Sequence, residues 1–129
     1  MPLIRGLVIV WIALAALAGC QSGPLKDIGR VLQSKGGPQL QEGVKLYEDG
    51  RYRDAQRSFD AALNAGLNDS EQVTAHKYLA FIDCASRRER QCRTHFRRAL
   101  ELNPAFELDA AEAGHPLWGP VFRSVKAGR

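Results

Sequence analysis

Three cysteines carry most of the reactive side-chain chemistry in this chain of 129 residues. Cys20 follows Leu17, Ala18 and Gly19, whereas Cys84 and Cys92 lie eight residues apart in a basic stretch. A thiol in such settings can be acylated, oxidised to a disulfide or used to bind a metal. The chain contains no Ser/His/Asp or Cys/His set with a structural context, and no phosphate-binding glycine loop. We therefore expect a protein that is not an enzyme.

The first twenty residues predict export. Arg5 precedes a short apolar run from Leu7 to Ala18, which has the flanks of a secretory signal peptide and is too short to span a bilayer comfortably. The sequence Leu-Ala-Gly-Cys that ends the run resembles the bacterial lipobox. That resemblance implies removal of residues 1–19 and covalent fatty acids such as palmitate on Cys20, with no other cofactor. The alternatives are an ordinary signal peptide or an uncleaved anchor.

The residues after Cys20 predict which membrane holds the protein and also predict a flexible tether. Gln21 stands where an Asp would favour retention at the inner membrane of enteric bacteria, so we expect an outer-membrane lipoprotein facing the periplasm. Glycine and proline are frequent as far as Pro38, and apolar residues are few. We therefore assign residues 20–37 to a flexible tether and residues 38–129 to the folded domain. A partner-binding peptide is the alternative for the tether.

A repeated apolar pattern predicts an all-α domain. The spacing i, i+4, i+7, i+8 places one set of residues on a single helix face, and the same spacing recurs 37 residues later. The first set is Ala55, Phe59, Ala62 and Leu63, and the second is Cys92, Phe96, Ala99 and Leu100. Helices are expected from Pro38 to near Asp49-Gly50, from a cap formed by Asp69 and Gln72 through Ala85, and from Ala105 to Ala113.

These residues resemble the tetratricopeptide repeat. The first copy matches at Gly43, Gly50, Tyr52, Ala55, Phe59 and Ala62, and the second at Ala80, Cys92, Phe96, Ala99 and Pro104. The second copy departs at Arg87, which replaces the turn glycine, and at Cys92, which replaces an alanine. The resemblance implies a short helical-hairpin array of two repeats. It also implies a concave surface where Val44, Tyr47, Lys77 and Phe81 contact a partner, with core packing the alternative for Val44 and Phe81.

The C-terminal residues must close the open end of such an array, because helical repeats bury their apolar faces against neighbours. We expect a capping helix carrying Phe106 and Leu108, followed by an irregular tail that is too rich in proline and glycine for a helix. Trp118 and Phe122 either fold back over the cap or anchor a partner.

The remaining two cysteines form a further candidate site. An exported compartment is oxidising, so Cys84 and Cys92 are expected to form a disulfide, with two buried free thiols as the alternative. Zinc binding with His76 and His95 is disfavoured because the spacing matches no standard zinc pattern, so no metal is expected.

Several arginines crowd one predicted helix, and Arg90, Arg93 and Arg97 share a face. We expect an acidic protein surface, anionic peptidoglycan or lipid head groups as partners, and no nucleic acid, because the protein is exported. The alternative is a solvated face balanced by Glu89 and Glu101.

The whole chain resembles small tetratricopeptide lipoproteins associated with type VI secretion loci, the TssQ family. The stretch from Glu112 to Phe122 carries this narrower resemblance. It implies an accessory adaptor that binds a protein partner in the cell envelope, such as a subunit of the secretion-system membrane complex. Self-association through an open flank is also possible in such an array. The alternatives are an activator of a peptidoglycan-remodelling enzyme, or a lipoprotein of pilus or outer-membrane assembly.

Overall fold

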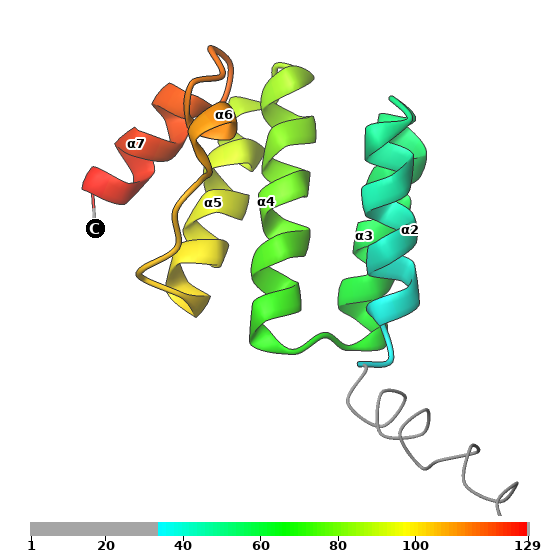
Figure 1. Ribbon diagram of the computed structural model, residues 1–129. Helices are drawn as coiled ribbons and strands as arrows, with labels where there is room; N and C mark the ends of the chain where they lie inside the picture. The colour runs from blue at the N-terminus through cyan, green and yellow to red at the C-terminus, as the bar shows by residue number, and fades with distance from the viewer. Residues whose placement is uncertain (1–33, 129) are drawn as a thin grey trace, which may run out of the picture. The chain divides into compact units, whose positions relative to one another are not determined.

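The computed structural model describes residues 34–128, which form six helices and no strand (Figure 1). The prediction of an all-α fold is therefore confirmed. The predicted signal peptide, Cys20 and most of the predicted tether lie outside the described residues. In chain order the helices are α2 (Gly37–Glu48), α3 (Tyr52–Ala65), α4 (Asp69–Ala85), α5 (Glu89–Leu102), α6 (Ala110–Ala113) and α7 (Gly119–Ala127).

The helices form two hairpins, α2 with α3 and α4 with α5, followed by a C-terminal segment that contains α6 and α7. In Figure 1, α2 and α4 stand side by side, while α7 lies on the far side of α5. The apolar core is divided in the same way: one cluster joins the first hairpin to α4, and a second joins α4 and α5 to the C-terminal segment. Helix α4 therefore lies in the middle of the core and packs on both sides.

The two hairpins place equivalent residues in equivalent environments. Phe59 and Phe96 are both fully buried, as are Ala62 and Ala99. The turns also match, because Gly50 and Arg87 both have positive φ angles, of 76° and 62°. Arg87 thus adopts the left-handed conformation that glycine adopts without steric cost. The 37-residue repeat is therefore a structural repeat, including the turn where the sequence departs from glycine.

Two predicted boundaries differ from those in the structure. Gly36 is buried, and its N–H donates to the carbonyl of Gly66 over 2.9 Å. The boundary between tether and domain at residue 37 is therefore too late, because Gly36 already packs against the first hairpin. At the start of α4 the capping box is formed by Asn68 and Glu71, one residue before the predicted pair.

The C-terminal segment differs from its prediction in two ways. The expected helix from residue 105 to 113 is wrong, because only α6 is helical there, opening at a capping box between Asp109 and Glu112. The tail expected to be irregular instead forms α7. Pro120 lies in the first turn of α7, where a helix needs no N–H donor, so the proline does not prevent helix formation.

Helix α7 closes the open end of the second hairpin. Phe122 is buried and packs edge to face against Phe96 and Phe106, with ring centroids 5.2 and 5.6 Å apart. Between the alternatives left open for Phe122, the structure shows the capping one.

Candidate functional site

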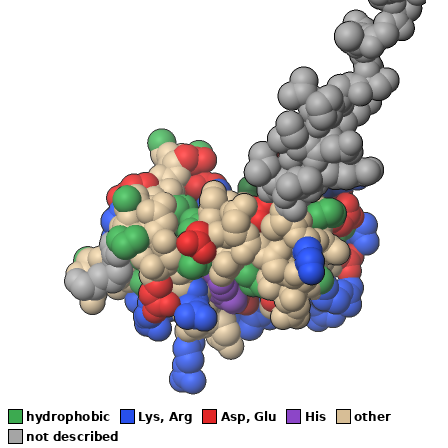
Figure 2. Space-filling model, turned by 90° about the horizontal axis from the view of Figure 1, so that it is seen from below, with side chains coloured by type: hydrophobic (Ala, Val, Ile, Leu, Met, Phe, Trp, Pro, Cys, Tyr) green, Lys and Arg blue, Asp and Glu red, His purple; other side chains and the backbone are tan. Residues whose placement is uncertain are grey.

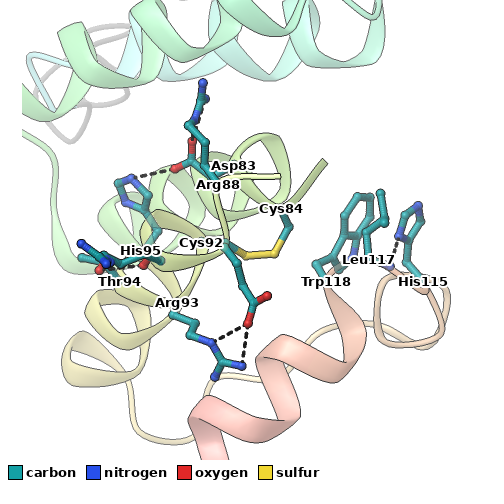
Figure 3. Close-up of a disulfide and its surroundings, with 12 residues drawn as sticks. Asp83, Cys84, Arg88, Cys92, Arg93, Thr94, His95, His115, Leu117 and Trp118 are labelled. Atoms are coloured by element: carbon teal, nitrogen blue, oxygen red, sulfur yellow. Dashed lines mark hydrogen bonds and ion pairs between the residues drawn. A yellow bond between two sulfur atoms is a disulfide. The ribbon is translucent and has the colours of Figure 1, made fainter. Parts of the chain in front are cut away.

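A disulfide closes the turn between α4 and α5. The Sγ atoms of Cys84 and Cys92 are 1.99 Å apart and their Cα atoms 5.2 Å apart (Figure 3). The predicted pair is therefore bonded in the structure. Cys92 occupies a fully buried position equivalent to Ala55 in the first hairpin, which explains why a small residue is needed there.

A buried carboxylate lies next to this disulfide. Asp83 is 2% exposed, and its carboxylate accepts a hydrogen bond from Arg88 Nε over 2.8 Å and lies 2.7 Å from Arg88 Nη2. Figure 3 shows the ring of His95 directed at the same carboxylate, with His95 Nε2 3.5 Å from Asp83 Oδ2. Arg88 also donates to Gln56 of α3, so this polar network links the two hairpins.

The spacing of residues in the sequence does not predict this network. Asp83 belongs to an otherwise apolar run of α4, and that single acidic residue was the available signal. A charge is tolerated in a core when it is paired and hydrogen-bonded.

Two histidines meet between α4 and α5. The Nδ1 atoms of His76 and His95 are 3.0 Å apart, although the residues are 19 positions apart in the chain. Burial lowers the pKa of His76 to about 4 and also lowers the pKa of His95, against the opposing effect of Asp83. Both imidazoles are therefore neutral at pH 7.

A row of aromatic rings crosses the hairpins, with a buried ring in its middle and exposed residues towards its ends. We call Tyr52, Tyr47, Phe81, Trp118 and His115 the aromatic row, because each ring contacts the next. The ring centroids are successively 5.3, 6.3, 4.4 and 3.4 Å apart. The row runs from the first hairpin across α4 to the C-terminal segment.

The ends of the aromatic row are open to solvent. Tyr52 is 47% exposed, and Leu117, beside Trp118, is 50% exposed. These are the two exposed large hydrophobic residues in the described part of the chain. Figure 1 shows that the turns carrying them lie at the same end of the domain, whereas residue 34 lies at the other end. This end therefore offers an apolar surface that the domain itself leaves uncovered.

Tyr47 adds a polar group to the middle of the row. Its pKa is raised to about 12, first because the phenol is partly buried and then because of nearby Tyr52, Tyr78 and Glu112. The hydroxyl therefore stays protonated at any physiological pH. It remains available as a hydrogen-bond donor.

The C-terminal segment is tied to α4 next to the aromatic row. Lys77 Nζ lies 2.7 Å from Glu112 Oε1, and both side chains are about one-fifth exposed. The Trp118 indole N–H donates to the Glu112 carbonyl over 2.9 Å. Figure 3 shows Trp118, Leu117 and His115 together on this segment. These contacts fix the position of Trp118 against α4.

The residues predicted to bind a partner fall into three groups. The first group, Val44, Tyr47 and Trp118, is partly exposed. Lys77 forms an ion pair with Glu112. Phe81 and Phe122, in contrast, are only 2% and 3% exposed. We correct these two assignments: both are core residues whose side chains cannot reach a partner.

The predicted arginine face lies on α5. Arg93 pairs with Glu89 and donates to Ser124 of α7, so it helps to hold α7 in place. Arg90 and Arg97 are exposed and form no ion pair within residues 34–128. Figure 2, a view from below, shows Lys and Arg side chains along one edge, with histidine surface between them.

Two features are absent from the described residues. Among the described residues, no three His, Cys, Asp or Glu side chains form a group that could hold a metal ion. No helix within residues 34–128 has the length and apolar character needed to cross a bilayer.

Comparisons with known proteins do not identify a relative. No protein-family model matches the chain, and no curated protein or solved structure matches it either. Any function must therefore be argued from the residues and their geometry.

Proposed function

We propose that this protein is a lipid-anchored tetratricopeptide-type adaptor that holds a protein partner at the periplasmic face of the outer membrane. The observation that carries the proposal is the aromatic row, which ends at exposed Tyr52 and beside exposed Leu117. Aromatic residues concentrate binding energy in protein interfaces because they bury a large area with few rotatable bonds.

The repeat geometry supports the tetratricopeptide part of the proposal. Gly43 packs directly against Phe59, so closely that a Cβ at position 43 would lie 2.7 Å from the ring. Phe96 occupies the equivalent buried position in the second hairpin. Helical arrays of this kind present an extended surface to other proteins.

The lipid anchor is proposed from the lipobox-like sequence that ends at Cys20. Several acyl chains hold a protein on a membrane far more firmly than one chain does. Mass spectrometry of the protein extracted from membranes should find a chain that begins at Cys20 and carries acyl groups. An unmodified Cys20 thiol would refute this part of the proposal without affecting the adaptor part.

We further propose that the partner belongs to the membrane complex of a type VI secretion system, and that this chain is an accessory component. The support is the resemblance carried by the stretch from Glu112 to Phe122. Part of this stretch forms the contacts that place Trp118 against α4. A partner that binds the exposed ends of the aromatic row would therefore contact this stretch directly.

Site-specific photo-crosslinking in native membranes tests the adaptor proposal. A photoreactive residue at position 52 or 117 should capture the partner, because both positions are exposed beside the aromatic row. A matched control places the same residue at Asn64, which is exposed near the other end of α3. Equal capture at all three positions would contradict the proposed surface.

The identity of the captured protein separates the alternatives. Subunits of the secretion membrane complex would support the accessory role. Sacculus fragments or a peptidoglycan hydrolase would instead support activation of a remodelling enzyme, and capture of pilus or outer-membrane proteins would support assembly. Recovery of a second copy of this chain would indicate self-association.

A further inference from the structure

The histidine pair between α4 and α5 has a geometry that the adaptor role does not require. His95 Nε2 lies 3.5 Å from the Asp83 carboxylate, so we assign the ring hydrogen to that nitrogen. The lone pair of His95 is then on Nδ1, which lies 3.0 Å from His76 Nδ1. Histidines that bind metals commonly donate their other ring N–H to a carboxylate, which fixes the ring and its tautomer.

The carboxylate that orients His95 is itself firmly held. Asp83 is nearly inaccessible, and Arg88 contacts its carboxylate through two guanidinium nitrogens. His95 therefore presents Nδ1 in a fixed direction. Only the ring of His76 has to adjust when a ligand enters between the two nitrogens.

We propose that His76 and His95 together bind one divalent transition-metal ion through their Nδ1 atoms, with Cu²⁺ the best-fitting ion. With metal–nitrogen bonds of about 2.05 Å, two adjacent ligands of a square-planar ion are about 2.9 Å apart. Two ligands of a tetrahedral ion such as Zn²⁺ are about 3.3 Å apart. The observed 3.0 Å is the length of the hydrogen bond that joins the two nitrogens in the metal-free pair, so either geometry requires the His76 ring to shift. Cu²⁺ is the best-fitting ion because it binds imidazole nitrogen more tightly than the other divalent ions of its series.

Binding requires a movement of the His76 ring and a change of its tautomer. In the metal-free pair His76 donates its Nδ1 hydrogen to His95, because His95 Nδ1 has no hydrogen. When the ion enters, that hydrogen moves to His76 Nε2 by exchange with water. Both Nδ1 lone pairs then face the ion, and no proton is released overall.

His76 is accessible from a surface cavity, and the pair leaves coordination positions open. His76 lines a cavity of about 270 Å³ together with Gln72, Arg98, Glu101 and Leu102. Because no third His, Cys, Asp or Glu completes a group in the described part of the chain, water would occupy the remaining positions. His76 lies eight residues before Cys84 on α4, which is about 12 Å along the helix. A bound ion would therefore cross-link α4 and α5 at a second point, away from the disulfide.

Titration of the tag-free full chain in detergent micelles with Cu²⁺ tests the proposal, with the Cys20 thiol blocked by acylation or alkylation. One equivalent should bind, and the electron paramagnetic resonance spectrum should show hyperfine splitting from two imidazole nitrogens. His76→Gln and His95→Gln should each weaken binding at least tenfold. His115→Gln is the matched control, since it removes a histidine distant from the pair, and its affinity should equal that of the unaltered chain.

A measurement on the unaltered chain guards against variants that fail to fold. Substoichiometric Cu²⁺ should selectively broaden the imidazole NMR signals of His76 and His95 and leave those of His115 sharp. The proposal is overturned by the absence of saturable binding, by a spectrum with fewer than two imidazole nitrogens, or by broadening centred on His115.

Discussion

Replacing Gly43 with alanine sets two known effects against each other. Alanine favours a helix interior over glycine by about 1 kcal/mol, so helix propensity alone predicts a more stable protein. In this structure, however, a Cβ at position 43 would lie 2.7 Å from both Cδ1 and Cε1 of Phe59. Contacts this short force one of the two groups to move.

The Phe59 ring has little freedom to move. It is fully buried and stacked on Tyr78, with ring centroids 5.5 Å apart and planes within 8° of parallel. Overpacking in such a core costs about 1–3 kcal/mol. We therefore expect Gly43→Ala to lower the free energy of unfolding by about 1 kcal/mol, after the gain in helix propensity is subtracted.

Thermal and urea unfolding, followed by circular dichroism on the disulfide-bonded chain, measure the effect. A loss of about 1 kcal/mol should lower the Tm by about 4–8 °C in a domain of this size. The second hairpin supplies a matched control, because its equivalent residue is already Ala80, which is fully buried. Ala80→Gly should also destabilise the protein, by about 1–2 kcal/mol, since it removes a packed methyl group and lowers helix propensity.

A double variant isolates the contact itself. Phe59→Leu shortens the side chain that the new methyl group at position 43 would meet, so adding Gly43→Ala to that background should cost little or increase stability. The reasoning is refuted if Gly43→Ala alone raises the Tm, or if its cost is the same in the Phe59→Leu background as in the unaltered chain.

Three further predictions concern the second hairpin. Arg88→Met should lower the free energy of unfolding by about 3 kcal/mol, because it leaves the buried Asp83 carboxylate without its positively charged partner and with only the neutral His95 ring beside it; adding Asp83→Asn should recover most of that loss in urea unfolding, and no recovery would contradict the pairing argument. Replacing both Cys84 and Cys92 with alanine should cost about 2–3 kcal/mol by thermal unfolding, because the bond restricts the unfolded chain; an unchanged midpoint would show that the disulfide does not contribute. In metal-free buffer, stability should fall by about 1–3 kcal/mol as the pH drops from 6.5 to 4, because burial lowers the pKa of His76 to about 4 and the unfolded chain then binds more protons than the folded one. His76→Gln should flatten this slope, and an unchanged slope would place the titration elsewhere.

Local signals in the sequence predicted most of the two hairpins. The predicted α2 ends near Asp49-Gly50, and the predicted α4 ends at Ala85, as the structure has them. The spacing of Phe59 and Phe96 identified residues that are fully buried. These features can be predicted from the sequence because helix periodicity, turn glycines and caps depend on residues close together in the chain.

The C-terminal segment could not be predicted in the same way. Proline and glycine between Gly114 and Pro120 suggested irregular structure, yet α7 forms beyond them. Its stability comes from Phe122 and Val125, which are buried in the cluster formed with α4 and α5. Most helical stability in proteins comes from such packing and little from local propensity. The residues of a short helix therefore do not by themselves predict that it forms.

The sequence by itself determined the helical class and the 37-residue repeat, because each follows from spacing along one or two neighbouring helices. It predicted the pairing of Cys84 with Cys92 but left two free thiols as an alternative, which the structure decides. Only the tertiary structure decided which aromatic side chains are core and which are surface, since Phe81 is buried by Trp118 from a distant segment. It also decided that His76 meets His95 beside a buried carboxylate. Contacts of this kind depend on how separate helices pack, and the spacing of residues along the chain does not specify that packing.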